Sequence, residues 1–188
     1  MKNFEFKKIA EEDIPLLHTW LKRPHVSEFW KEQAPVDLAT FRKKFAGKMS
    51  DEKADPYLVV LQGKPIGYIQ THALGDKTFG IEQFIGVEEF VNKGLGSMFV
   101  KEFTDQLLLK KDVQRIISDP SVLNLRAQKA YEKAGFKKLS GKNSFDNGEV
   151  VLMEKRVRKS SVEIFDPEES IKEKTSSKEN GRSIKKAS

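Results

Sequence analysis

The chain has 188 residues, of which 38% are hydrophobic, so one domain with a single core is the natural expectation. The sequence contains no cysteine, which excludes disulfide bonds, a thiol nucleophile and cysteine-ligated zinc. The formal net charge is +6, but lysine is interleaved with glutamate and aspartate. We therefore expect no uniform basic face and no nucleic-acid partner.

The N-terminal stretch MKNFEFKKIA has no apolar segment of the kind found in secretory signals. No apolar run in the chain is long enough to cross a bilayer. These two features predict a cytoplasmic protein with no membrane partner.

The first half of the chain alternates strand and helix patterns. Residues 4–9 alternate apolar and polar side chains, which predicts a strand. Asp13 is a candidate N-cap for a helix that ends before Pro24, because proline disfavours helical geometry in the preceding residue. The other elements expected here are a helix at 37–48 and two strands at 56–62 and 65–71, joined by a Gln-Gly turn.

The second half centres on a glycine-rich turn at 93–97, with the sequence K-G-L-G-S. A strand is expected before it at 79–84, and Leu95, Phe99 and Phe103 follow at helical spacing. The first N–H groups of such a helix have no helical partner, and the helix dipole favours an anion there. The turn therefore predicts a phosphate site, although it matches neither a P-loop nor a dinucleotide fingerprint.

The C-terminal part divides at Val157. Up to that residue the patterns predict a strand at 114–118, a helix at 125–134, and strands at 136–139 and 150–156 around an Asn-Gly turn. Residues 158–188 are rich in lysine, glutamate and serine and contain few apolar residues. We therefore expect residues 1–157 to form the domain and residues 158–188 to be a disordered tail.

The order of these motifs resembles the GCN5-related N-acetyltransferases, or GNAT enzymes. The resemblance covers nearly all of the first 157 residues and includes the turn at 93–97, N-L-R-A at 124–127 and Y-E-K-A-G-F at 131–136. It implies an α/β fold with a mixed central sheet, helices on both faces and a splayed strand pair that forms the acyl-CoA cleft. It also implies acetyl-CoA as cosubstrate, no metal, and a monomer or homodimer.

Within that family the chain looks most like the aminoglycoside 6′-N-acetyltransferases, through R-P-H-V at 23–26, P-I-G-Y at 65–68, G-I-E-Q at 80–83 and D-P-S at 119–121. The resemblance implies acetyl transfer to a primary amine of an aminoglycoside, an antibiotic-resistance activity. The chain departs from that group at 75–78, where it lacks their longer Trp- and acid-rich insertion. Three alternatives stay open: another amine acceptor (a siderophore precursor, a polyamine or a protein N-terminus), a CoA-binding regulator without turnover, and a nucleic-acid adaptor.

Acetyl transfer requires an amine that has lost a proton and a thiolate that gains one. The resemblance implies that Glu82 accepts the amine proton and that Tyr131 protonates the thiolate. Without the resemblance, Glu82 would read as a solvent-facing strand carboxylate and Tyr131 as a core residue of its helix.

The remaining site residues are also implied by the resemblance. The expected cofactor contacts are Phe84, Ile85, Lys93, Gly94, Leu95, Gly96, Ser97, Asn124 and Ala127. The expected acceptor contacts are Glu82, Asp119, Asp146, Tyr68, His72 and Trp30. Asn124 also fits a helix N-cap, and the histidines lack the spacing of metal ligands.

Overall fold

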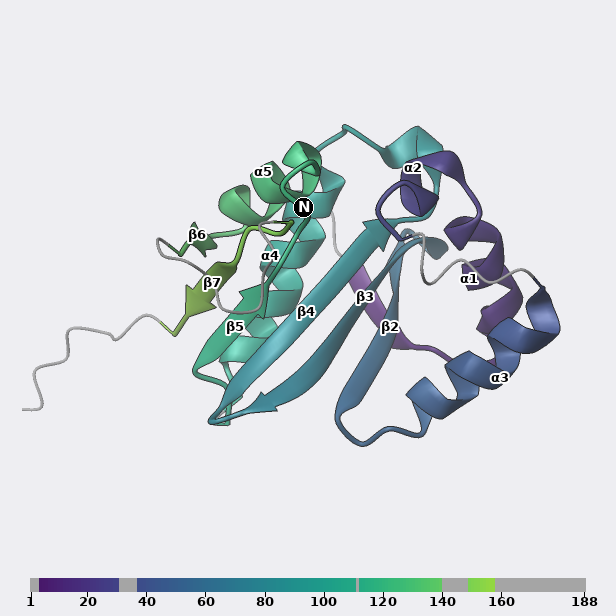
Figure 1. The fold of residues 1–188 in the computed structure, drawn as a ribbon, viewed down its shortest axis with the longest axis horizontal. Coiled ribbons are helices and arrows are strands. Elements are labelled where there is room, and N and C mark those ends of the chain that lie inside the picture. Colours follow the sequence, from purple (N-terminus) through teal and green to yellow (C-terminus); the bar gives the residue numbers. More distant parts are fainter. Residues whose placement is uncertain (1–3, 31–36, 111, 140–148, 158–188) are drawn as a thin grey trace, which may run out of the picture. The chain divides into compact units, whose positions relative to one another are not determined.

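The computed structural model describes residues 4–30, 37–110, 112–139 and 149–157. These residues form a mixed sheet of seven strands in the order β1-β2-β3-β4-β5-β7-β6, with helices on both faces (Figure 1). The expected α/β fold is therefore confirmed. The predicted tail, the Asn-Gly turn and Asp146 lie outside the described residues.

The elements are β1 (Phe4–Lys8), η1 (Glu11–Asp13), α1 (Ile14–Leu21), α2 (Pro24–Ser27), α3 (Leu38–Met49), β2 (Ala54–Leu61), β3 (Lys64–Gly75), β4 (Thr78–Ile85), η3 (Glu88–Phe90), α4 (Leu95–Leu108), β5 (Arg115–Ser118), α5 (Leu125–Lys133), β6 (Lys137–Lys138) and β7 (Met153–Arg156).

Two tight hairpins join β2, β3 and β4. Gln62 and Gly63 adopt φ angles of 52° and 74°, and Asp76 and Lys77 adopt 45° and 57°. Turns with two left-handed residues match the twist of antiparallel strands, so each hairpin closes over two residues. The second hairpin carries β3 to Gly75, beyond the predicted end of that strand, because the pairing with β4 continues almost to the turn.

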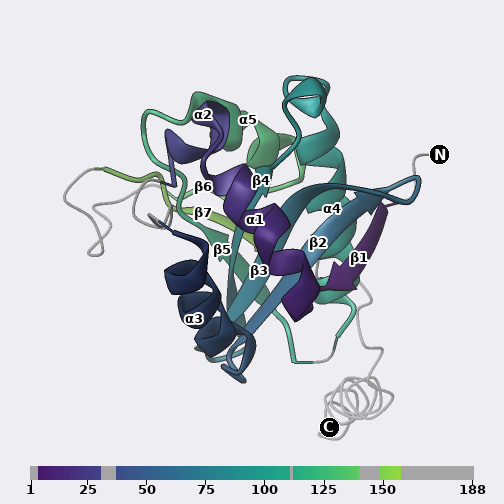
Figure 2. The same ribbon diagram turned by 90° about the vertical axis from the view of Figure 1, so that its right-hand side faces the viewer.

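The two faces of the sheet bury separate apolar clusters. Figure 2 shows α1 and α3 on the opposite side of the sheet from α4. The cluster under α1 and α3 includes Trp20, Tyr68 and Phe84, and the cluster under α4 includes Ile81 and Phe99. Because side chains alternate along a strand, Glu82 shares the α1/α3 face of β4 with Phe84. Within the described residues, no helix is both long and apolar enough to cross a membrane.

Strands β4 and β5 separate after a short contact. They pair in parallel only from Thr78 to Gly80, whereas β3 accompanies β4 as far as Ile85. Among the described residues, no strand pairs with the β5 side of β4 from Ile81 onward. This is the splayed strand pair that the resemblance to GNAT enzymes implies.

Helix α2 lies against the end of that edge and was not predicted, because Arg23-Pro24 was interpreted only as a helix stop. Pro24 instead occupies the first position of α2, where the missing N–H costs no hydrogen bond. His25 Nε2 lies 3.1 Å from the carbonyl oxygen of Ile85, and Arg23 donates to the carbonyl oxygen of Gly86 at 2.8 Å. These two side chains fix α2 to the end of β4.

Gly86 gives a test of the packing between α1 and the sheet. A Cβ atom at this position would lie 2.1 Å from Cδ2 of Trp20, whose side chain is 1% exposed. Because the indole cannot move without opening the core, Gly86→Ala should lower the free energy of unfolding by about 1–3 kcal/mol, measured by denaturant or thermal melts. The matched control is Gly47→Ala in α3, where nothing lies within 4 Å of the added atom and stability should hold or rise. Equal melting behaviour of the two variants would contradict this packing.

Candidate active site

The glycine turn places the start of α4 at the opening between β4 and β5. Gly94 is the N-cap residue and has a φ of 75°, a left-handed conformation that suits glycine. The next residue, Leu95, is 1% exposed and anchors the first turn of α4 in the core. Ser97 Oγ donates to the carbonyl oxygen of Gly94 at 2.8 Å. The turn is therefore fixed by packing and by its own hydrogen bond, as a preformed anion site requires.

A cavity of about 410 Å³ opens at this helix start, and we call it the α4 cavity. Arg126, Lys129 and Lys133 of α5 line it together with the turn, and no described carboxylate does so. Gly96 also lines it, and a Cβ there would meet only Cδ1 of Ile85, at 3.7 Å. The α4 cavity thus combines a helix N-terminus with positive side chains, which favours a polyanionic ligand.

A second cavity of about 420 Å³ lies toward the end of β5, and we call it the β5 cavity. Three carboxylates line it, from Glu28, Glu82 and Asp119, and no described lysine or arginine does so. The loop after β5 is held in place because the N–H of Val151 donates to Pro120 and Gln128 Nε2 donates to Ser121, at 2.8 and 3.0 Å. The β5 cavity is therefore suited to a cationic ligand.

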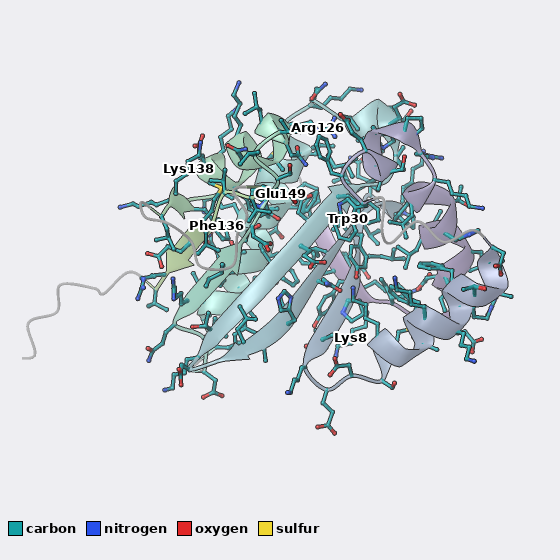
Figure 3. All side chains as sticks on the ribbon, in the orientation of Figure 1. Lys8, Trp30, Arg126, Phe136, Lys138 and Glu149 are labelled. Atoms are coloured by element: carbon teal, nitrogen blue, oxygen red, sulfur yellow. The ribbon has the colours of Figure 1, made fainter. Side chains whose placement is uncertain are left out.

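The two cavities adjoin each other. They share the lining residues Phe29, Trp30, Gln83, Asn124 and Ala127. Trp30 lies near the end of β4 (Figure 3), and its ring packs edge-on against Phe84 at a centroid distance of 5.1 Å. Asn124 Oδ1 accepts a hydrogen bond from the N–H of Ala127 at 3.0 Å, so this side chain caps α5, one of the two roles that its position allowed. Ligands in the two cavities would meet at this shared wall.

Glu82 sits at the end of a hydrogen-bonded chain on the α1/α3 face of the sheet. Gln70 Nε2 donates to Glu82 Oε2 at 2.7 Å, and the Tyr68 hydroxyl donates to Gln70 Oε1 at 2.6 Å. Burial raises the pKa of Tyr68, and the charge of Glu82 raises it further. Tyr68 is therefore a neutral donor at physiological pH. On α3, burial lowers the pKa of Lys48, an effect that the charge of Glu82 opposes.

Tyr131 lines the β5 cavity together with Glu82. Its side chain is 3% exposed, and this burial is the main cause that raises its pKa. The charges of Glu82 and Asp119 raise the pKa further, while hydrogen bonds with Ser118 and Gln83 lower it. The net effect is a phenol that keeps its proton at neutral pH, which is the state required of a proton donor.

Most of the predicted site residues line one or both cavities. Glu82, Asp119, Trp30 and Tyr131 line the β5 cavity, and Phe84, Ile85, Gly94, Gly96, Ser97, Asn124 and Ala127 line the α4 cavity. Four others line neither: Lys93 is exposed, Leu95 and Tyr68 are buried in the core, and the His72 ring covers Gly80. Leu95 can reach a ligand only through its backbone.

Several cavity residues were missed by the sequence interpretation. Arg126, Lys129 and Lys133 repeat along α5 at spacings that place them on one side of a helix, which is a signal available in the sequence. Gln70 lines neither cavity but donates to Glu82, and it gave no such signal, because its proximity to Glu82 depends on strand register. Among the described residues, no group of three or more His, Cys, Asp or Glu side chains could hold a metal ion.

Comparison with known proteins agrees with this geometry. Residues 10–141 match the family described as Acetyltransferase (GNAT) domain. The aminoglycoside N(6′)-acetyltransferase type 1 of Klebsiella pneumoniae is 33% identical over 162 residues, covering 79% of this chain and 81% of that protein. A kanamycin resistance protein of Rhizobium radiobacter is 35% identical over 77 residues, covering 41% of this chain and 71% of that protein.

Solved structures agree as well. The crystal structure of aminoglycoside acetyltransferase AAC(6′)-Ib in complex with coenzyme A and kanamycin superimposes with a TM-score of 0.74 and 31% identity, covering 82% of this chain and 95% of that chain. The family match spans well over half of this chain, and the same fold recurs in the relative. The chain belongs to the GNAT family and is an acetyl-CoA-dependent N-acetyltransferase.

Proposed function

We propose that the protein transfers the acetyl group of acetyl-CoA to the 6′ primary amine of an aminoglycoside. The observation that carries this proposal is the opposite charge of the two adjoining cavities: cationic side chains line the α4 cavity, and carboxylates line the β5 cavity. Acetyl-CoA is a polyanion and an aminoglycoside is a polycation, so each ligand has one complementary cavity. The names of the relatives support the same pair of substrates.

The α4 cavity fits the donor. The N-terminus of α4 and the absence of a side chain at Gly96 allow phosphate oxygens to approach the backbone. Arg126, Lys129 and Lys133 add positive potential along the same wall. Beyond Gly80, β4 has no pairing with β5, and its residues Glu82, Gln83 and Phe84 line the β5 cavity, both cavities and the α4 cavity in turn.

The β5 cavity fits the acceptor. Glu28, Glu82 and Asp119 come from three separate segments, so an acceptor with several amino groups can contact more than one of them. Phe29 and Trp30 supply apolar surface for a sugar ring at the shared wall. The tight turn at Asp76 and Lys77 means that the β3–β4 hairpin adds no long loop to this cavity.

The chemistry follows from two of the titratable groups that line the β5 cavity, Glu82 and Tyr131. The amine nitrogen attacks the thioester carbonyl, its proton passes to Glu82, and an N–C bond forms. The C–S bond then breaks, and Tyr131 donates its proton to the departing thiolate, giving free CoA.

The acceptor is identified by measuring thiol release from acetyl-CoA with a panel of aminoglycosides, polyamines and peptides. The same proposal places a monomeric or homodimeric enzyme in the cytoplasm, with no nucleic-acid or membrane partner.

Gly96→Val tests the donor site. The added side chain projects into the α4 cavity with little protein contact, so CoA affinity should fall about tenfold or more while the fold is kept. Isothermal calorimetry with CoA measures the affinity, and a thermal melt verifies folding. Met98→Ala on the same helix is the control, because Met98 is exposed and should not affect affinity. Full CoA affinity in folded Gly96→Val would rule out this placement.

Glu82→Gln tests the proton acceptor. The variant keeps the shape of the side chain but cannot take the amine proton, so kcat should fall roughly a hundredfold while the affinity for CoA stays the same. The loss should shrink at high pH, where more of the amine is already neutral. Glu89→Gln is the control, because Glu89 is exposed in η3 and lines neither cavity. A normal neutral-pH rate in Glu82→Gln would remove the assignment.

Tyr131→Phe tests the proton donor. The variant removes only the hydroxyl group, so kcat should fall about tenfold or more with little change in the KM for acetyl-CoA. Tyr57→Phe is the matched control, since Tyr57 packs against Phe103 and lines neither cavity. If both variants keep the rate of the unaltered enzyme in a thiol-release assay, Tyr131 is a packing residue only.

A further inference from the structure

A buried polar chain runs through an otherwise apolar cluster on the α1/α3 face. Tyr68 and Gln70 are 2% and 3% exposed, and Tyr68 packs against the rings of Phe84, Phe45 and Trp30. A buried amide is costly unless its donor and acceptor are both satisfied. Here both are satisfied, by Tyr68 on one side and by Glu82 on the other.

The orientation of the Gln70 amide is determined by its two neighbours. The Glu82 carboxylate can only accept hydrogen bonds, so the NH₂ group of Gln70 must face it. Oε1 then faces Tyr68, whose raised pKa keeps the hydroxyl protonated and able to donate. A reversed amide would place an oxygen against the carboxylate. Tyr68 therefore stabilises the one orientation in which Gln70 donates to Glu82.

We propose that Gln70 is a positioning residue for the transfer reaction, an inference that rests on the proposed function. Its amide occupies Oε2 of Glu82 and restricts the carboxylate to one rotamer. The other oxygen, Oε1, is then the atom that receives the amine proton: the N–H bond breaks, an O–H bond forms at Oε1, and the nitrogen lone pair attacks the thioester. Tyr68 acts one step further away, because it fixes the Gln70 amide.

The elements packed around the Tyr68–Gln70–Glu82 hydrogen bonds carry other ionisable groups. They are His72 on β3, Lys44 and Lys48 on α3, Glu28 after α2, Asp119 after β5, and Tyr131 on α5. The rate is therefore compared over the full pH range, and not at a single pH.

The test is Gln70→Met, which keeps the length of the side chain and removes the amide. We expect kcat to fall about tenfold or more, with the KM for acetyl-CoA unchanged. The loss should shrink at high pH, as in Glu82→Gln, because more of the amine is then already neutral and needs no proton acceptor. Thr71→Val is the matched control: Thr71 is the next residue of β3, is 4% exposed, and points to the opposite face.

A double variant separates positioning from general packing. In thiol-release assays with kanamycin, Gln70→Met should cause no further loss in a Glu82→Gln background, since the residue acts only through Glu82. Tyr68→Phe should give a smaller loss than Gln70→Met. Two results would overturn this inference and leave the proposed base intact. One is an equal loss from Gln70→Met in the unaltered enzyme and in the Glu82→Gln variant. The other is a normal rate in Gln70→Met when Glu82→Gln is impaired. A normal rate in Glu82→Gln would instead refute the proposed base, and the inference with it.

Discussion

The separation of β4 from β5 after Gly80 is the constraint on which the rest of the site depends. A strand that loses its neighbour exposes backbone groups and opens the sheet, which is tolerable only if other elements cover the gap. Here α2 covers the end of β4 through His25 and Arg23, and α5 borders the gap on the far side. Arg126 of α5 also donates to the carbonyl oxygen of His25 at 3.1 Å. Both cavities occupy the space that this separation creates.

Charge is distributed unevenly around that opening. The formal net charge of +6 describes a weakly basic protein and says nothing about where the charges lie. In the described fold, α5 presents three cationic side chains to the α4 cavity, while the carboxylates of the β5 cavity come from the residue after α2, from β4 and from the loop after β5. Adjacent cavities of opposite sign can attract a polyanion and a polycation to one shared wall. This local asymmetry is more informative about function than the total charge.

In the proposed mechanism, the buried hydrogen bonds from Tyr68 through Gln70 to Glu82 let an apolar face support a polar reaction centre. An isolated carboxylate beside such a cluster would carry a large desolvation cost. The Gln70 amide reduces that cost, and it also restricts the rotamer of Glu82. If Gln70 positions Glu82 as proposed, stability and catalysis place the same requirement on its amide, and its loss is expected to affect both.

The sequence by itself determined the elements and motifs that depend on near neighbours. The glycine turn before α4, the Asn124 cap, the Gln62-Gly63 hairpin and the periodic face of α4 were all predicted, because each depends on the conformation or spacing of a few adjacent residues. Glu82, Tyr131 and Trp30 were predicted through motif resemblance, and all three line the β5 cavity.

Only the tertiary structure decided which residues face each other across strands and helices. A regular hairpin that pairs Gly75 with Thr78 would place Gln70 opposite Gln83. The shift of register between Ala73 and Gly75 places it opposite Glu82 instead. A shift of one residue changes every cross-strand partner beyond it, and no local pattern records it. The position of α2, the covering of Gly80 by His72 and the charge of each cavity likewise follow from contacts between distant segments, which the linear order of residues does not specify.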